Sequence, residues 1–380
     1  MRSIADTIAR LTAAATRKSE ASEAAGTALN SLGDFGSNPG DLRAFFFAPD
    51  KLPAGSPLVV VLHGCTQSAA AYDRASGWSH LAQEQGFALL YPEQQRANNA
   101  MGCFNWFEPG DTRRGQGEAL SIQQMILAVQ KTHAIDPQRV FITGLSAGGA
   151  MTSTMLATYP EIFAGGAIIA GLPHGAATGM VQAFDRMRGH GLPSQTKLSA
   201  ALRDASSHTG PWPRISVWHG SADEAVGVGN AEAVVAQWRA VHGLSQSPSD
   251  VDRIDHVPHR SWRGADGRVL IEEYIVPGMG HGTPLKTQGE GAYGISAPFM
   301  LDVGISSTLR IAQFWEIADR AGIKSATSSK STQTEVRPLQ PALQEPRRLQ
   351  GQRIEPRKAH SMSAVGKVIE DALRAAGLLK

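Results

Sequence analysis

The sequence has 380 residues, of which 42% are hydrophobic and 18% are charged, and its formal net charge is +2. This length suits one large domain or two smaller ones, each able to bury a hydrophobic core. A charge so close to zero argues against nucleic acid as the main partner, and no apolar run approaches the roughly 20 residues of a transmembrane helix.

The N-terminal segment, residues 1–40, is rich in alanine, serine, threonine and glycine. This composition predicts a weak helix followed by an irregular stretch at the periphery of the molecule. Charged residues interrupt any apolar block in the segment, so we expect no signal peptide and a cytoplasmic location.

Residues 41–322 form the predicted main domain, in which strand and helix patterns alternate. Apolar or β-branched runs predict strands at 42–48, 58–62, 87–91, 140–143, 215–219 and 269–276. Helical spacing predicts helices at 75–85, around 122–129 and at 231–242. Such alternation is typical of an α/β fold with a mostly parallel central sheet and helices on both faces. Residues 178–213 break the pattern and are a candidate cap or insertion over the active face.

The C-terminal part has a different composition. Residues 323–362 predict a disordered basic linker, since residues 324–380 hold 11 Lys/Arg against 5 Asp/Glu. Residues 363–380 predict an amphipathic helix whose apolar stripe comprises Val365, Val368, Ile369, Ala372, Leu373 and Ala376. This helix either docks on the main domain or binds a partner or a polymer surface.

Ser146 is the first candidate for chemistry. It follows the predicted strand 140–143 and stands in Gly144-Leu145-Ser146-Ala147-Gly148, just before a helix-compatible stretch. A serine on a sharp strand-to-helix turn exposes its hydroxyl above the sheet, and the glycines allow close backbone approach. A turn serine in a nucleotide-binding fold is the alternative, but the first β–α crossover lacks the glycine fingerprint that pyrophosphate needs.

A serine nucleophile needs a base and a carboxylate that orients the base. Asp223 follows the predicted strand 215–219, and His281 follows the predicted strand 269–276, so both lie in strand-end loops in the order Ser, Asp, His. Glu224 is the weaker alternative carboxylate. His219 stands at the end of a predicted strand, and we expect it to have a structural role. His256 and His259 fall in a charged segment that we expect to be exposed.

Two backbone N–H groups are predicted to form an oxyanion hole. The N–H of Ala147 follows from the turn at Ser146, and the N–H of Cys65 comes from the loop after strand 58–62. Neither a metal-ligand set nor a phosphate-cradling loop is visible in the sequence, so no metal and no cofactor are expected.

Six motifs in this order resemble the polyhydroxybutyrate-depolymerase family of esterases, which includes feruloyl and acetylxylan esterases. They are Leu62-His63-Gly64-Cys65-Thr66-Gln67, Cys103-Phe104-Asn105-Trp106-Phe107, Arg114-Gly115-Gln116-Gly117-Glu118, Gly144-Leu145-Ser146-Ala147-Gly148-Gly149, His219-Gly220-Ser221-Ala222-Asp223 and Gly280-His281-Gly282. The resemblance spans about residues 42–318 and implies the α/β-hydrolase fold, with Ser146, Asp223 and His281 as catalytic residues. It also implies a Cys65–Cys103 disulfide. Many members of this family are secreted, which makes an extracellular location the alternative.

The predicted activity is hydrolysis of carboxylic esters through an acyl-enzyme, with poly(3-hydroxybutyrate) or a related polyhydroxyalkanoate as the favoured substrate. Feruloyl or acetylxylan esterase activity is the alternative within the same reaction class. A non-catalytic granule-binding protein and a serine peptidase are less favoured. Trp106 and Phe107 are expected either to line the substrate cleft or to pack in the core.

Overall fold

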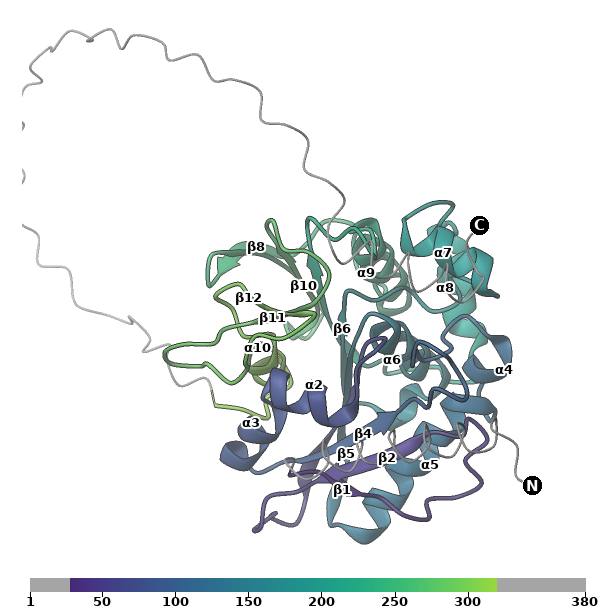
Figure 1. Cartoon of the computed structure of the whole chain (residues 1–380). Coiled ribbons are helices and arrows are strands. Elements are labelled where there is room, and N and C mark those ends of the chain that lie inside the picture. Colours follow the sequence, from purple (N-terminus) through teal and green to yellow (C-terminus); the bar gives the residue numbers. More distant parts are fainter. Residues whose placement is uncertain (1–27, 320–380) are drawn as a thin grey trace, which may run out of the picture. The chain divides into compact units, whose positions relative to one another are not determined.

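A ten-stranded sheet runs through residues 28–319, the part of the chain that the computed structural model describes (Figure 1). Its strand order is β1-β2-β4-β3-β5-β6-β7-β10-β9-β8. The strands are β1 (Asn30–Ser31), β2 (Arg43–Phe47), β3 (Ser56–Leu62), β4 (Ala88–Glu93), β5 (Ile135–Leu145), β6 (Gly165–Ile169), β7 (Arg214–Gly220), β8 (Asp250–Ile254), β9 (Val257–Arg263) and β10 (Val269–Val276). The six strands from β4 to β10 in this order are mutually parallel, and the outer pairs are antiparallel. The predicted α/β class is confirmed.

Helices cover both faces of the sheet (Figure 1). They are α2 (Ala69–Ser76), α3 (Trp78–Gln85), α4 (Pro109–Thr112), α5 (Gly117–Thr132), α6 (Ala147–Thr158), α7 (Met180–Met187), α8 (Gln195–Asp204), α9 (Gly229–His242) and α10 (Ser307–Phe314), with a 3-10 turn at Pro160–Ile162. A small parallel pair, β11 (Thr283–Leu285) and β12 (Met300–Asp302), lies outside the main sheet. No helix among residues 28–319 is both long and apolar enough to cross a membrane.

The central strands are apolar throughout because both of their faces are buried. All seven residues of β3 are buried. Leu58, Val60 and Leu62 join the core under α5, α6 and α9, whereas Val59 and Val61 join the core under α2, α3 and α10. The alternation of side chains along a strand therefore supplies two cores from one continuous apolar run.

Strand β1, strand β6 and the hairpin of β8 and β9 were not predicted. Strand β6 begins with Gly165 and Gly166, so its β-branched residues are limited to Ile168 and Ile169. A Cβ added to Gly166 would lie 2.3 Å from Leu156 Cδ1, so the glycine lets α6 pack closely on the sheet. The hairpin of β8 and β9 carries many charged side chains at the sheet edge, which hid its strand character.

The terminal segments are described only in part. Residues 28–40 fall in the segment that we expected to be peripheral, yet they contribute β1, and Gly40 N–H donates to Ser121 Oγ on α5 at 2.8 Å. This part of the segment is thus attached to the sheet and to α5. The predicted linker 323–362 and the predicted helix 363–380 lie outside the described residues.

The insertion at residues 178–213 forms α7 and α8 between β6 and β7. Helix α8 packs against α9, and Gln237 Nε2 donates to Leu198 O at 2.8 Å (Figure 1). The insertion therefore extends the helical layer beside α9. Its predicted role as a cap over the active face stays a prediction.

The predicted helix 75–85 is wrong in its boundaries, because two helices meet at Gly77. The φ of Gly77 is +74°, and its N–H closes α2 by donating to Asp73 O. The Asp73 carboxylate then accepts from Ser79 N–H at 2.9 Å and from the Tyr91 hydroxyl at 2.5 Å. The helical spacing of apolar residues continues through the junction of α2 and α3. In the sequence, only Gly77 indicates that one helix ends and the next begins.

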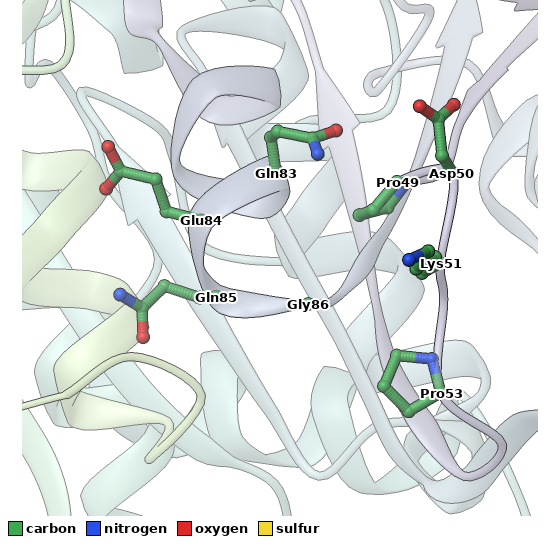
Figure 2. Close-up of a pocket in the computed structure, with 8 residues that line it drawn as sticks. All are labelled: Pro49, Asp50, Lys51, Pro53, Gln83, Glu84, Gln85 and Gly86. Atoms are coloured by element: carbon green, nitrogen blue, oxygen red, sulfur yellow. The ribbon is translucent and has the colours of Figure 1, made fainter.

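A surface pocket of about 440 Å³ lies where α3 leads into β4 and where β2 leads into β3 (Figure 2). It is lined by Pro49, Asp50, Lys51, Pro53, Gln83, Glu84, Gln85 and Gly86. Because β3 and β4 are parallel and begin here, the pocket lies at the edge of the sheet opposite to their carboxyl ends. It is therefore separate from the loops that carry the predicted catalytic residues.

Gly77→Ala should destabilise the protein by about 2–5 kcal/mol, from a left-handed alanine and an overpacked contact. The added Cβ would lie 1.9 Å from the backbone oxygen of Tyr293. Gly86→Ala is the matched control, since Gly86 also ends a helix at φ +75° but has only Pro53 Cδ near its Cβ position, at 3.9 Å. Urea unfolding of both variants measures the difference, and equal losses would contradict the steric argument.

Candidate active site

Three loops that follow parallel strands bring the predicted catalytic residues together. Ser146 follows β5, Asp223 follows β7, and His281 follows β10. His281 Nε2 lies 2.9 Å from Ser146 Oγ, and His281 Nδ1 lies 2.8 Å from Asp223 Oδ2. Carboxyl ends of parallel strands meet at one edge of a sheet, which explains why residues 135 positions apart are in contact. The arrangement forms a continuous chain from hydroxyl to imidazole to carboxylate.

The turn at Ser146 requires an unusual backbone. Ser146 has φ +58° and ψ −117°, a region that residues with a side chain rarely adopt. A Cβ on Gly144 would lie 2.4 Å from Gly148 O, and a Cβ on Gly148 would lie 2.4 Å from Leu62 O and 2.5 Å from His63 O. The glycines are therefore needed for the close contact between the start of α6 and the end of β3.

Asp223 is a buried carboxylate with several donors. Its Oδ1 accepts from the backbone N–H groups of Ala225 at 2.9 Å and Val226 at 2.8 Å. Burial alone would raise the pKa of Asp223, but bonds from His219, His281 and Val226 outweigh it and hold the pKa below its usual value. Asp223 therefore remains charged beside His281. Glu224, the alternative carboxylate, is exposed.

The other candidate histidines take different places. His219 is buried, its Nε2 lies 2.7 Å from Val226 O and 3.4 Å from Asp223 Oδ2, and it thus supports the loop of Asp223 from behind. His256 is exposed in the turn between β8 and β9. The expectation that His259 is exposed is wrong. Only 7% of its surface is accessible, and its Nδ1 lies 2.7 Å from Asp252 Oδ1, because the edge hairpin folds this position onto β10.

The two predicted oxyanion donors lie on segments that touch at Gly148. Ala147 is the first residue of α6, so its N–H has no acceptor within the helix. Cys65 lies in the loop after β3, and its N–H donates to no group among residues 28–319. Neither N–H group therefore has an acceptor among residues 28–319, and their contact with an oxyanion stays a prediction.

The disulfide between Cys65 and Cys103 is confirmed, with the two Cα atoms 4.3 Å apart. Thr66 N–H also donates to Met101 O at 2.8 Å. The loop that holds Cys65 is therefore tied, covalently and by a backbone bond, to the loop of residues 99–107.

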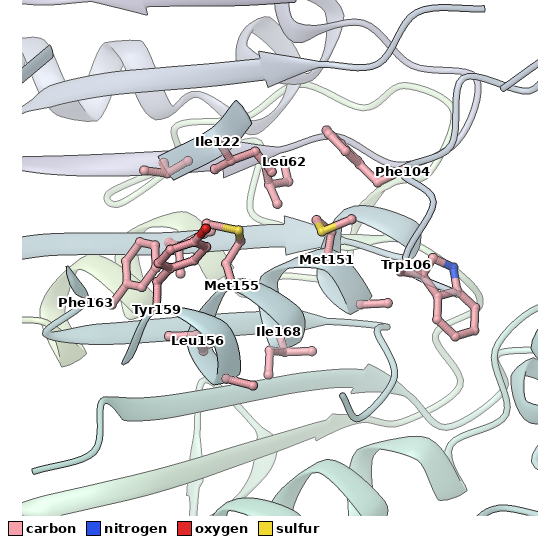
Figure 3. Close-up of a cluster of buried hydrophobic side chains, with 14 of the residues drawn as sticks. Leu62, Phe104, Trp106, Ile122, Met151, Met155, Leu156, Tyr159, Phe163 and Ile168 are labelled. Atoms are coloured by element: carbon pink, nitrogen blue, oxygen red, sulfur yellow. The ribbon is translucent and has the colours of Figure 1, made fainter. Parts of the chain in front are cut away.

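Trp106 and Phe107 pack in the core that lies under α5 and α6. They are 8% and 9% exposed, their rings meet edge to face at 5.4 Å, and Figure 3 shows Trp106 at the border of the cluster that holds Met151 and Phe104. Of the two alternatives for these aromatic residues, the structure supports packing. Contact with substrate stays a prediction.

Glu118 is a buried acid to which the sequence assigned no role, although it stands in one of the six motifs. It is 1% exposed, its Oε2 accepts from Asn105 N–H at 2.9 Å, and its Oε1 accepts from Gln94 Nε2. Burial, and next the nearby charge of Asp111, raise the pKa of Glu118 to about 8. A lone glutamate at the start of a helix carries no sequence signal for burial, because first-turn acids are usually solvated.

Residues 43–252 match the family described as esterase PHB depolymerase. The chain is 48% identical to poly(3-hydroxyalkanoate) depolymerase C of Paucimonas lemoignei over 296 residues, which cover 76% of this chain and 70% of that protein. The chain belongs to the PHB depolymerase family of esterases. It is also 30% identical to an acetylxylan esterase of Coprinopsis cinerea, over 67% of this chain and 69% of that protein.

Among solved structures, an acetyl xylan esterase from Aspergillus awamori superposes with a TM-score of 0.65 at 22% sequence identity. The match covers 77% of this chain and the whole of that chain. The likeness confirms the α/β-hydrolase fold that the resemblance implied, and membership of the family makes the chain a carboxylic ester hydrolase.

Glu118→Gln should change how stability depends on pH. Because the folded pKa of Glu118, about 8, exceeds its ordinary value of 4.5, the folded chain binds the extra proton between these values, and wild-type stability falls as pH rises through this window. A glutamine side chain does not titrate, so the variant lacks this pH-dependent contribution. Its deficit in unfolding free energy relative to the wild type should therefore be larger at pH 5 than at pH 9. Urea unfolding at both pH values tests this, and a constant deficit would show that the carboxyl titrates normally.

Proposed function

We propose that this chain is a serine esterase that cleaves its substrate through an acyl-enzyme, with Ser146 as nucleophile, His281 as base and Asp223 as the carboxylate that orients His281. The observation that carries the proposal is the pair of short hydrogen bonds through the two ring nitrogens of His281. His281 Nδ1–H donates a hydrogen bond to Asp223, which leaves Nε2 as the acceptor for the proton of Ser146.

The reaction follows from this geometry. Ser146 Oγ forms a bond to the ester carbonyl carbon while its proton moves to His281 Nε2. The oxyanion lies against the N–H groups of Ala147 and Cys65, whose bonds strengthen as charge develops. The bond to the leaving alkoxide then breaks, and that alkoxide takes the proton from His281. Water repeats the attack on the acyl-enzyme with His281 as base, which releases the acid and restores Ser146.

The favoured substrate is a poly(3-hydroxyalkanoate) such as poly(3-hydroxybutyrate). The support is the 48% identity to a protein named poly(3-hydroxyalkanoate) depolymerase C. Acetylxylan or feruloyl esters are the second candidate, because relatives with those names are about 30% identical. Binding of a polymer granule through residues 363–380 belongs to the same proposal and would bring the active site to an insoluble substrate.

The disulfide bears on the location of the enzyme. Cys65 and Cys103 are the only cysteines of the chain and are paired with each other. Since such bonds persist chiefly in oxidising compartments, the pairing supports the extracellular alternative over the cytoplasmic prediction.

Ser146→Ala should lower kcat on p-nitrophenyl butyrate by at least about 10³-fold, because the hydroxyl is the nucleophile. The variant should fold normally, since alanine removes one hydroxyl and no apolar core contact. Circular dichroism and thermal unfolding provide the control. A folded variant that keeps most of its activity would eliminate the acyl-enzyme mechanism and would revive the non-catalytic alternative.

Asp223→Asn should reduce kcat by up to about 10⁴-fold, because the amide favours the wrong tautomer of His281. Glu224→Gln is the matched control, a neutralised acid one residue further along the same loop, and its kcat should stay near that of the wild type. Steady-state kinetics of the two variants tests the assignment, which a more damaging Glu224→Gln would overturn.

The substrate proposal is tested by product release from different ester materials. The enzyme should release 3-hydroxybutyrate from amorphous poly(3-hydroxybutyrate) granules faster than it releases ferulate from a feruloylated sugar or acetate from acetylated xylan. Ser146→Ala on each material controls for adsorption and spontaneous hydrolysis. Faster release of ferulate or acetate would move the enzyme to the second candidate class.

A further inference from the structure

A buried polar network runs from the start of α5 to the loop that holds Cys65. Its far end is Glu118, which accepts from Asn105 N–H with one oxygen and from Gln94 Nε2 with the other. The two bonds end on the two oxygens of one carboxyl group, so Glu118 binds two different segments at once. One segment is the end of β4 with Gln94, and the other is the loop that follows Cys103.

Gln94 links Glu118 to two further residues, Cys103 and His63. Its side-chain Nε2 also donates to Cys103 O at 3.1 Å, and its backbone N–H donates to His63 Nε2 at 3.1 Å. Gln94 is 4% exposed and its Oε1 accepts from Asn98 Nδ2 at 3.0 Å. The amide nitrogen and the amide oxygen of Gln94 are therefore both hydrogen-bonded, which fixes the orientation of the side chain. Glu118 determines that orientation because it accepts from Nε2.

His63 is held in one tautomer by this network. Because a backbone N–H can only donate, His63 Nε2 is the acceptor, and the ring proton lies on Nδ1, which donates to Gly64 O at 2.8 Å. Burial lowers the pKa of His63 to about 4, so the neutral ring persists at working pH. Phe104, labelled in Figure 3, packs on the ring at a centroid distance of 5.0 Å and excludes water from that side.

The bond to Gly64 O has a direct consequence for Cys65. The Gly64 carbonyl and the Cys65 N–H belong to one peptide unit, and in a trans peptide they point in opposite directions. Since His63 Nδ1–H and Gln67 N–H both donate to the Gly64 carbonyl, the Cys65 N–H points away from these two groups. The Cys65–Cys103 disulfide holds the same residue from its side chain.

We infer that Glu118 is a positioning residue for the oxyanion loop, residues 63–68 between β3 and α2, acting through Gln94 on His63 and on Cys103 to orient the Cys65 N–H. The inference rests on the proposed function, which makes that N–H an oxyanion donor. Glu118 touches no reacting atom. Its effect is to hold the peptide unit Gly64–Cys65 at the angle that the tetrahedral intermediate requires.

The other charged or titratable groups around the network are Asp111 on α4, whose Oδ1 accepts from Glu118 N–H at 3.2 Å, His63, and the Arg43–Glu93 ion pair beyond His63. An ionised Glu118 accepts with both oxygens, whereas the neutral acid carries a proton on one of them. The ionised form should therefore hold the loop better.

The test compares Glu118→Gln with Ser121→Ala. The amide introduced by Glu118→Gln keeps the shape of the acid but offers one acceptor where the carboxylate offers two. Ser121 is the matched control, because it lies on the same helix, is fully buried and accepts from Gly40 N–H, away from the oxyanion loop. The measurements are kcat and KM on p-nitrophenyl butyrate at pH 7 and pH 9, with unfolding followed in the same buffers.

At pH 9, where Glu118 is ionised, Glu118→Gln should lower kcat by about 10-fold or more while KM stays within about 2-fold, because an oxyanion donor acts in the transition state. The ratio of wild-type to variant kcat should be larger at pH 9 than at pH 7, and any titration that both enzymes share cancels in that ratio. The deficit of Glu118→Gln in unfolding free energy should instead be smaller at pH 9 than at pH 7. Ser121→Ala should leave kcat near the wild-type value.

Gln94→Met provides a second variant should Glu118→Gln fold poorly, since it removes the side-chain donors and keeps the backbone N–H to His63. It should lower kcat in the same way. A kcat near wild type in either folded variant, or a kcat loss that follows the stability deficit with pH, would overturn the inference. Failure of the proposed function is distinguishable, because Ser146→Ala would then remain active.

Discussion

The active site depends on one close backbone contact, the packing of the start of α6 on the ends of β3 and β6. A Cβ on Gly148 would lie 2.4 Å from Leu62 O, and one on Gly149 would lie 2.8 Å from Ile169 O. Because these positions lack side chains, the helix begins directly over the sheet and Ser146 takes its positive φ. Strain of this kind costs of order 1–3 kcal/mol and persists only when the surrounding packing holds it in place. Here the apolar central strands supply that packing, and the same contact places Gly148 against Leu62 and His63, which lead into the loop of Cys65.

Two buried carboxylates near the site illustrate how surroundings set ionisation. Asp223 has two backbone donors and two histidines, which together hold its pKa below the usual value although it is buried. Glu118 has fewer donors and a second acid, Asp111, nearby, so burial dominates and its pKa rises to about 8. The difference suits the proposed roles. A charged Asp223 can stabilise the imidazolium of His281 throughout the working range, whereas Glu118 changes its hydrogen-bonding capacity within that range.

The loops around Ser146 are held from several directions. The loop that holds Cys65 is linked to residues 99–107 by the disulfide and by Thr66 N–H, and Gln67 Nε2 donates to Pro298 O near the strand β12. The loop of His281 is held in turn by Ala222 N–H, which donates to Met279 O at 3.0 Å, and by its own Thr283 N–H, which donates to Phe299 O at 2.8 Å. Loops carry the chemistry of α/β folds because a rigid sheet positions them, and each loop here has at least one bond to a neighbouring loop.

The sequence by itself determined the fold class, the identity of the predicted catalytic residues Ser146, Asp223 and His281, and their order along the chain. These features depend on local signals, namely apolar runs, glycines at a turn and residues placed directly after strands. The sequence did not reveal the edge hairpin with the buried His259, the break at Gly77 or the network of Glu118, Gln94 and His63. Those features depend on contacts between segments far apart in the chain. Burial of a polar residue is a property of what packs on it, and only the tertiary structure decided that for Glu118 and His259.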